Sequence, residues 1–269
     1  MTQTQQLIIA DAHTHIFPDK IALKAVAHIG EFYDIPMCHA GSCQALLESG
    51  RAIGVKKYLV CSTATRPGQV ASINNFIREC CDAHPEFLGF GTLHPGFAAI
   101  PGEVERIRSL GLHGVKLHPD FQEFYIDAPE AEPIYRACAA AGLPILFHTG
   151  DARYDWSAPA RMAAVARKFP DLTCIAAHFG GYCHWQDVEV YQDLPNVWLD
   201  TSSSLFQLPR ERALELIQKL GHRRFLFGTD FPMWDHGEEL ERFLALGLPE
   251  EVRDDILYRN FQRLFGVTL

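Results

Sequence analysis

Short runs of apolar residues recur along the chain, and turn-forming residues separate them. Eight of these runs predict strands, and most are continuous rather than alternating between apolar and polar positions. Continuous apolar strands are typical of parallel sheets that are covered on both faces. The eight expected strands are LIIADAHTH (7–15), VKKYLVCST (55–63), FLGFGTLHP (87–95), GLHGVKLHP (111–119), LPILFHTG (143–150), LTCIAAHFG (172–180), VWLDTSS (197–203) and RFLFGTDFP (224–232).

Segments with helical spacing lie between these runs, and several have a proline near the start and a glycine after the end. Strands that alternate with helices over about 250 residues predict a single (β/α)8 barrel of the α/β class. An open, doubly wound sheet is the alternative, but no GxGxxG motif follows the first strand. The clearest expected helices are 68–84, 101–110, 129–141, 158–169 and 209–220.

No composition shift or linker divides the chain, so residues 1–269 are expected to form one domain. The irregular stretch 30–42 is long for a connection and predicts a loop over the mouth of the barrel. With 48% hydrophobic residues, the chain has enough apolar material for a large core.

Charge and cysteine content narrow the range of partners and compartments. The net charge is −9 and there is no basic stripe, which argues against nucleic acid and favours a small-molecule substrate. There is neither an apolar run of the roughly 18–20 residues that a membrane span needs nor a basic, cleavable leader, so no membrane association is expected. The eight cysteines include no CxxC pair, which indicates reduced thiols in a cytoplasmic protein. A homodimer is the candidate assembly.

Metal-type ligands gather where the expected strands end. In a (β/α)8 barrel the active site lies at the carboxyl ends of the strands, so these side chains are expected to converge on one face. They are His13, His15, His94, Lys116, His118, His148, His178 and Asp230.

The sequence DAHTHIFP, which begins at Asp11, carries two of these histidines. Residues i and i+2 of a strand point to the same side, so His13 and His15 are expected to face the barrel axis and Thr14 the helices. Two adjacent imidazoles together with carboxylates suit one divalent ion, with zinc first and manganese or iron as alternatives. Asp11 shares the inward parity of His13 and is expected to orient a histidine ligand from a deeper position.

The motifs DAHTHIFP, GVKLHP, LFHTG, AAHFGG and FGTDFP occur in the order typical of one enzyme family, and together they span nearly the whole chain. The chain thereby resembles the amidohydrolase superfamily, and within it the branch that holds aminocarboxymuconate-semialdehyde decarboxylase and γ-resorcylate decarboxylase. The resemblance implies that one metal ion is bound by His13, His15, His148 and Asp230, with His178 beside the bound water as a catalytic group. The branch includes hydrolases, decarboxylases and hydratases.

We therefore expect a metal-dependent hydrolase in which a metal-bound water attacks an amide, ester or lactone carbonyl. Asp230 would take the proton, and His178 would orient the water or stabilise the oxyanion. The first alternative is a non-oxidative decarboxylase or hydratase that acts on a small unsaturated or aromatic carboxylate. The second is a ligand-binding barrel without catalysis, which the intact motif positions disfavour.

Four further side chains are expected to contact the substrate: Lys116, His118, Arg66 and Arg153. Binuclear relatives carry a carboxylated lysine on the fourth strand, where Lys116 lies. Since the branch usually binds one metal, an unmodified Lys116 that holds a substrate oxyanion is preferred. The GVKLHP segment has no glutamate of the kind that nuclease-like relatives carry in the fourth-strand region, which weakens a phosphoesterase interpretation.

Other residues have a structural interpretation beside the functional one. His94 is expected to be a hydrogen-bonded loop residue, while His39, His184 and His236 are expected to be solvated or to belong to a lid. Asp200 is expected either to contact the substrate or to cap the following segment. The segment CHAGSC, from Cys38 to Cys43, matches no metal motif well. Aromatic residues that could line a pocket or simply pack are Trp156, Phe179, Trp185 and Trp234.

Overall fold

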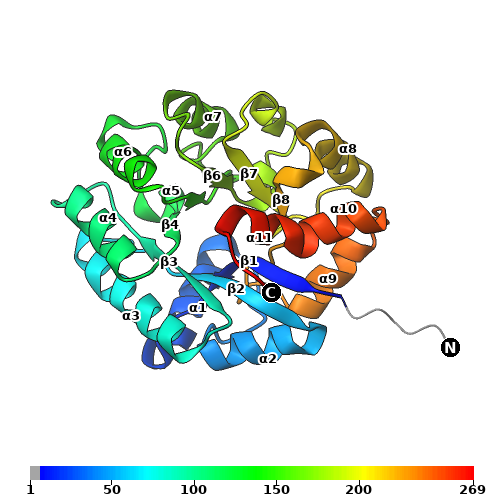
Figure 1. Ribbon diagram of the computed structural model, residues 1–269, viewed down its shortest axis with the longest axis horizontal. Coiled ribbons are helices and arrows are strands. Elements are labelled where there is room, and N and C mark those ends of the chain that lie inside the picture. Colours follow the sequence, from blue (N-terminus) through cyan, green and yellow to red (C-terminus); the bar gives the residue numbers. More distant parts are fainter. Residues whose placement is uncertain (1–6) are drawn as a thin grey trace.

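Eight parallel strands form one sheet that curves into a barrel, and the helices surround it (Figure 1). The computed structural model describes residues 7–269; residues 1–6, which the sequence analysis places in the same domain, lie outside the described residues. Neighbouring strands pair in chain order from β1 to β8. The strands are β1 Ile9–His15, β2 Val55–Cys61, β3 Phe87–Thr92, β4 Gly114–Leu117, β5 Ile145–Phe147, β6 Cys174–Ala176, β7 Val197–Asp200 and β8 Phe225–Leu226.

The barrel closes through backbone contacts between β1 and the residues at and after β8. The amide of Ala12 donates to the carbonyl of Phe227 at 2.8 Å, and the amide of Asp230 donates to the carbonyl of His13 at 2.8 Å. Gly228 makes this closure feasible, because a Cβ there would lie only 3.1 Å from the Cβ of His13. The expected (β/α)8 barrel is confirmed, and the open doubly wound sheet is excluded.

The five helices expected from the sequence are all present. The structure contains further helices before, between and after them in the chain. None of the helices in the described part of the chain combines the length and apolar character that crossing a membrane requires. The helices are α1 Asp19–Tyr33, α2 Cys43–Ile53, α3 Val70–Ala83, α4 Ile100–Ser109, α5 Pro119–Gln122, α6 Glu132–Ala141, α7 Pro159–Lys168, α8 Arg210–Leu220, α9 His236–Leu244, α10 Glu250–Asp254 and α11 Asn260–Phe265; shorter helical turns are Pro67–Gln69, Pro129–Ala131, His178–Gly180, Val188–Tyr191, His222–Arg224 and Asp255–Arg259.

The expected loop 30–42 is partly helical, which corrects the prediction. Helix α1 continues to Tyr33 and ends at Asp34, which has a left-handed conformation with a φ of 55°. The backbone amide of Asp34 donates to the carbonyl of Gly30. Helix α1 reaches this far because Tyr33 has a buried partner, the imidazole of His118, 2.9 Å from its hydroxyl. A helix end therefore reaches the barrel mouth where a flexible loop was expected.

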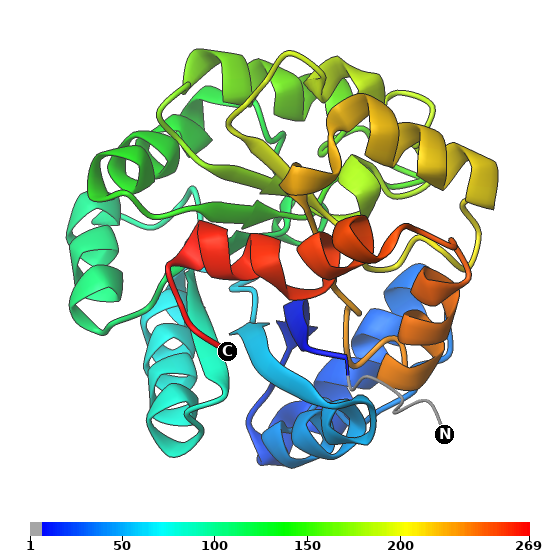
Figure 2. The same cartoon turned by 45° about the vertical axis from the view of Figure 1, so that its right-hand side comes forward.

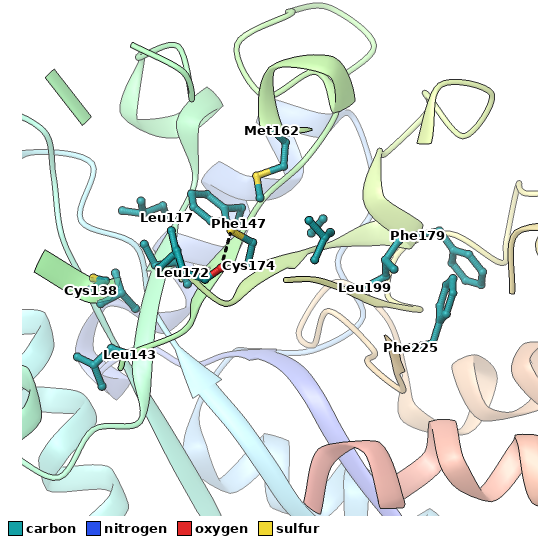
Figure 3. Close-up of a cluster of buried hydrophobic side chains, with 14 of the residues drawn as sticks. Leu117, Cys138, Leu143, Phe147, Met162, Leu172, Cys174, Phe179, Leu199 and Phe225 are labelled. Carbon is teal, nitrogen blue, oxygen red and sulfur yellow. Dashed lines mark hydrogen bonds between the residues drawn. The ribbon is translucent and has the colours of Figure 1, made fainter. Parts of the chain in front are cut away.

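The larger core lies between the strands and the surrounding helices. Figure 3 shows part of it, where Leu117, Phe147 and Leu199 of the strands meet side chains of the outer layer such as Met162. These side chains are fully buried, and each contributes about 1.5–3 kcal/mol by leaving water.

A second, smaller core fills the barrel interior at the end where the strands begin. There α11 lies across the barrel (Figures 1 and 2), and its residue Phe261 is buried among inward side chains of the strands. Phe265 adds an edge-on contact to Phe90 of β3, with ring centroids 5.8 Å apart. This apolar plug leaves the opposite end of the barrel for the polar residues.

Candidate metal centre and active site

His13 and His15 lie side by side at the end of β1, with their Nε2 atoms 3.2 Å apart. The pairing of β1 with β2 shifts register between Asp11 and Thr14. Because of this irregularity, Ala12 packs in the inner core while His13 also faces the barrel interior. The expectation that both histidines point inward therefore agrees with the geometry.

The parity argument fails for Asp11, which does not approach the ring of His13. Its Oδ1 accepts from the backbone amide of His13 at 3.0 Å, and its Oδ2 accepts from the hydroxyl of Thr229 at 2.6 Å. The same Oδ2 lies 3.1 Å from Nε2 of His236, a residue of the outer helix α9. The register shift between Asp11 and Thr14 breaks the two-residue alternation of β1. Asp11 therefore points toward the outer helices, while His13 faces the barrel interior.

Asp230 completes a compact group of three donor atoms. Its Oδ1 lies 3.2 Å from Nε2 of His15 and 3.5 Å from Nε2 of His13. Ligand atoms 2.0–2.1 Å from a tetrahedral zinc ion lie roughly 3.3 Å from each other. The three separations match this value, so the group has the donor spacing that one divalent ion requires.

A buried carboxylate orients His13. Nδ1 of His13 donates to Oδ2 of Asp200 at 2.9 Å, so its Nε2 keeps a lone pair directed at the donor group. Asp200 also accepts the backbone amides of His178 and Ser202 at 3.0 Å. Although burial opposes its charge, the neighbouring His13 holds the pKa of Asp200 well below its usual range. Asp200 thus orients His13 without belonging to the donor group itself, a role that was not predicted from the sequence.

The surroundings of Asp230 keep it ionised. Its Oδ2 accepts from the hydroxyl of Ser203 at 2.6 Å, and that hydroxyl accepts from the indole of Trp234 at 2.8 Å. Burial opposes the charge, but His13 and His15 outweigh it and hold the pKa of Asp230 well below its usual value. The same contact acts on His15: burial works against its charge, yet Cys61 and Asp230 raise its pKa to about 9. A bound ion must therefore displace a proton from His15.

His148 lies next to this group but is directed at His178. The carbonyl of Gly150 lies 2.8 Å from Nε2 of His148 and can only accept, which places the proton on Nε2. The Nδ1 of His148 then has a lone pair, and it faces Nε2 of His178 at 3.0 Å. Burial lowers the pKa of His178 to about 4, so this imidazole is neutral at pH 7. The structure thus brings three of the four expected ligands together and holds the fourth against His178.

Lys116 and His118 extend the site along β4. The Lys116 side chain is fully buried, and its Nζ lies 3.0 Å from Nε2 of His13. Burial lowers the pKa of Lys116. His118 stacks on His148 with ring centroids 3.9 Å apart. Lys116 therefore lies beside the donor group and His118 beside His148, and the expected contact of both with a substrate stays a prediction.

Aromatic side chains cover the site. Tyr33 of α1 contacts His118 and lies 5.7 Å from Phe121 and 5.9 Å from Tyr182, measured between ring centroids. Tyr182 in turn lies 5.9 Å from His178. Tyr33 was not predicted, since its segment was expected to be irregular; its spacing within DKIALKAVAHIGEFY could have revealed the helix that carries it.

The two expected arginines differ in position. Arg153 packs over the ring of Phe32 at 4.1 Å and pairs with Asp151 at 2.8 Å, next to Tyr33 at the barrel mouth. Arg66 is exposed after β2, and within residues 7–269 no contact joins its side chain to the donor group. The structure therefore brings Arg153 near the site but not Arg66.

Comparison with known proteins gives the family. A profile described as amidohydrolase matches residues 10–267. The chain belongs to the amidohydrolase family. No curated protein matches it.

Solved structures share the fold of this amidohydrolase. An uncharacterised TIM-barrel protein from Bordetella bronchiseptica is 23% identical, covering 97% of this chain and 99% of the other with a TM-score of 0.80. 5-Carboxyvanillate decarboxylase from Sphingomonas paucimobilis is 18% identical, covering 97% and 100% with a TM-score of 0.74. Dihydroxybenzoic acid decarboxylase from Polaromonas sp. JS666, which holds manganese and 2-nitroresorcinol, is 17% identical, covering 97% of each chain with a TM-score of 0.73.

Backbone strain in the amidohydrolase concentrates at the site. His178, Ser203 and Asp230 have φ values of 62°, 45° and 61°, in the left-handed region that non-glycine residues rarely adopt. Such conformations cost of the order of 1–3 kcal/mol each and persist where the surroundings impose them. Asp230 is held in place because its amide bonds to the carbonyl of His13.

Several expectations for other residues can now be judged. His94 is a loop residue whose Nδ1 accepts from the amide of Gly96, as expected. His236 was expected to be solvated or in a lid, which is wrong: it is fully buried against Asp11 and Ser49 because α9 packs on the barrel there. Asp200 caps the segment that follows it, since its Oδ1 accepts from the backbone amide of Ser202, and its contact with a substrate stays a prediction.

The aromatic residues divide between packing and the site. Trp156 stacks on Tyr154, Phe179 lies in the outer core beside Phe225, and Trp185 donates to the carbonyl of His178. Trp185 thus contacts His178 of the site through its backbone, and Trp234 is linked to Asp230 through the hydroxyl of Ser203.

Proposed function

We propose that this amidohydrolase is a metal-dependent, non-oxidative decarboxylase of a small, planar aromatic or unsaturated carboxylate. The observation that carries the proposal is the aromatic group Tyr33, Phe121 and Tyr182, which packs against histidines of the site beside a donor group for one divalent ion. A flat ring can pack against such side chains while its carboxylate reaches the ion. Decarboxylase activity in two relatives of the same fold adds support.

His13, His15 and Asp230 would hold the ion, with His148 as the proposed fourth ligand. Zinc remains our first choice because imidazole and carboxylate are its usual ligands, and manganese is the second because a relative holds it. The ion would bind the carboxylate or an adjacent hydroxyl of the substrate and draw electron density from the ring. Lys116 and His118 would contact the substrate's oxygen atoms, and Arg153 would stand at the entrance.

The reaction replaces the carboxylate by hydrogen, so one proton must reach the carbon before carbon dioxide leaves. We assign this transfer to His178, whose Nε2 faces the site beside His148. A proton that the imidazole of His178 takes up from solvent would pass to the carbon and leave His178 neutral, the form that burial favours by lowering its pKa to about 4. The ionised Asp230 would take up a proton from a substrate hydroxyl in the same enclosed space.

Hydrolysis of a lactone, ester or amide is the second candidate function. It rests on the family and on Asp230, an ionised carboxylate within 3.5 Å of two histidine nitrogens, which is suited to take a proton from an attacking water. The substrate would again be a small molecule, because aromatic side chains enclose the site.

The test begins with the metal content of the purified protein and of Asp230→Asn. We expect about one zinc or manganese per chain in the wild type, less in Asp230→Asn, and no loss in Asp171→Asn, an exposed carboxylate used as the control. Absence of metal after reconstitution would overturn the proposal.

The loaded enzyme is then offered aromatic and unsaturated carboxylates in D₂O, with lactones, esters and amides in parallel. Decarboxylation releases carbon dioxide and places one deuterium at the carbon that lost the carboxylate. Hydrolysis without carbon dioxide would reject decarboxylation in favour of the second candidate.

A further inference from the structure

Helices α2 and α3 are neighbours on the outside of the barrel (Figures 1 and 2), and a cavity of about 640 Å³ lies between them. The residues of α2 and α3 that line it include Cys43, Leu47, Phe76 and Cys80. No residue of the proposed metal centre lines this cavity. The cavity is therefore separate from the proposed metal centre.

Two thiols meet at the wall of this cavity. Sγ of Cys43 lies 3.4 Å from Sγ of Cys80, although 37 residues separate them in the chain. Both are free thiols; Cys43 is half-buried and Cys80 is buried. A disulfide requires a sulfur separation of about 2.05 Å, so the two atoms need to approach by only about 1.4 Å.

The two thiols are not equivalent. Cys43 is the first residue of α2, a helix of 11 residues, where the positive end of the helix dipole favours a thiolate. A thiolate at Cys43 also accepts a hydrogen bond from the Cys80 thiol, which lowers the pKa of Cys43. The same contact, together with burial, raises the pKa of Cys80. Cys43 is thus suited to attack, and Cys80 to resolve the product.

We propose that Cys43 and Cys80 form a reversible dithiol site that a small hydroperoxide oxidises to a disulfide between α2 and α3. The Cys43 thiolate attacks the terminal peroxide oxygen; an S–O bond forms, the O–O bond breaks, and hydroxide or an alkoxide leaves. The Cys80 sulfur then attacks the sulfenic sulfur, the S–O bond breaks, and the hydroxyl leaves as water with the Cys80 proton. Two electrons pass from the two sulfurs to the peroxide, and a dithiol reductant reverses the step.

The neighbouring cysteines provide matched controls. Cys81 follows Cys80 in the chain, but burial raises its pKa to about 11, and Cys38 is exposed five residues before Cys43. Trypsin releases residues 25–51 with Cys38 and Cys43, and residues 79–106 with Cys80 and Cys81. A cross-linked peptide alone is therefore ambiguous, and single substitutions decide which thiols are joined.

The experiment treats the full-length protein with hydrogen peroxide, alkylates the remaining thiols and analyses the tryptic digest without reduction. We expect the 25–51/79–106 cross-link in the wild type, in Cys38→Ser and in Cys81→Ser, and its disappearance after dithiothreitol. In Cys43→Ser and Cys80→Ser it should fall at least about tenfold. A cross-link that depends on Cys38 or Cys81 would overturn the assignment.

Cys80→Ser gives a second measurement, because it removes the resolving thiol and should trap sulfenic acid at Cys43, detectable with a dimedone probe. Should the serine variant fold poorly, as judged by circular dichroism, Cys80→Ala keeps the test because it leaves no polar group in the buried position. Peroxide that leaves the wild type uncross-linked, or that oxidises Cys43 only to the sulfinic acid, would reject the site.

Discussion

The two ends of the barrel interior are built from the same strands, but one end is filled with apolar side chains and the other with polar ones. Where the strands begin, the apolar side chains of Ala10, Phe90 and Leu146 pack with Phe261 of α11. Where they end, His13 and Asp230 are buried almost as deeply but are polar. Burial stabilises the first end directly, whereas at the second each polar group needs a partner.

At the polar end, the partners of the buried carboxylates are histidines rather than water. Asp200 lies against His13, and Asp230 lies against His13 and His15. These contacts keep both carboxylates ionised in a region where burial alone would neutralise them. The comparison teaches that the apolar end carries stability while the polar end carries chemistry at a cost in stability.

The largest expected effect tests the chemical role of the polar end. Asp230→Asn removes the carboxylate that both completes the donor group and exchanges a proton, so we expect activity to fall by at least about 10⁴-fold. The substitution keeps the shape of the side chain, so circular dichroism should match the wild type. Activity within tenfold of the wild type at full metal loading would show that Asp230 is outside the reaction.

The next effect concerns the apolar end. Phe261→Ala opens a cavity beneath the barrel, and we expect the free energy of unfolding to fall by about 3–5 kcal/mol. The turnover rate of the protein that remains folded should change less than about threefold, because Phe261 lies at the opposite end from the donor group. Urea denaturation and activity at low temperature measure the two quantities. A large loss of turnover in the folded protein would mean that the two ends are coupled.

Asp200→Asn tests whether metal binding depends on the orientation of His13, because Asp200 holds the His13 ring but is not itself a proposed ligand. The amide cannot accept from Nδ1 of His13 and from the two backbone amides equally well, so His13 loses its fixed orientation. We expect metal affinity to fall about 10–100-fold while the rate at saturating metal changes less. Titration against a competing chelator measures this, with Asp171→Asn as the exposed control. Unchanged affinity would reject the role given to Asp200.

The sequence predicted the barrel well because its strands are continuous apolar runs. Such runs follow from the fold itself, since the strands are buried on both faces. Five helices were also placed correctly, and several of them have a proline near the start and a glycine after the end. The last turn of helix α1, residues 30–33, was predicted as part of a loop. The spacing of its residues could have shown the helix, but it contains no information about the contact between Tyr33 and His118, which lie 85 residues apart.

For the candidate site, the sequence indicated which residues gather at the strand ends but not how their rings turn. His148 was placed correctly at the end of β5, yet its orientation depends on the carbonyl of Gly150 two residues later. Asp11 was misplaced because a register shift in β1 breaks the two-residue period. Whether His148 binds metal, and whether Arg66 contacts a substrate, stay predictions.

Asp120, a buried carboxyl at the active-site end of the barrel, gives the smallest and most specific prediction. Its Oδ2 accepts from Ser157 at 2.6 Å and lies 3.7 Å from Nε2 of His148, but its buried Oδ1 has no partner among residues 7–269. Burial raises the pKa of Asp120 to about 7. The folded protein thus holds this proton at a pH where the unfolded chain has released it.

The sign of the pH dependence follows from this difference. Stability from protonated Asp120 is fully present below pH 3.8, the ordinary pKa, and is lost as the pH rises through about 7. Asp120→Asn cannot ionise, so at pH 8 it should be more stable than the wild type by on the order of 2 kcal/mol, with the advantage shrinking toward pH 4. Urea denaturation of the metal-free protein at pH 5, 6.5 and 8 measures this trend. Glu239, whose pKa burial also raises to about 7, leaves a residual slope in the variant. Parallel curves for wild type and variant would show that Asp120 stays ionised, and that the active-site end compensates its charge after all.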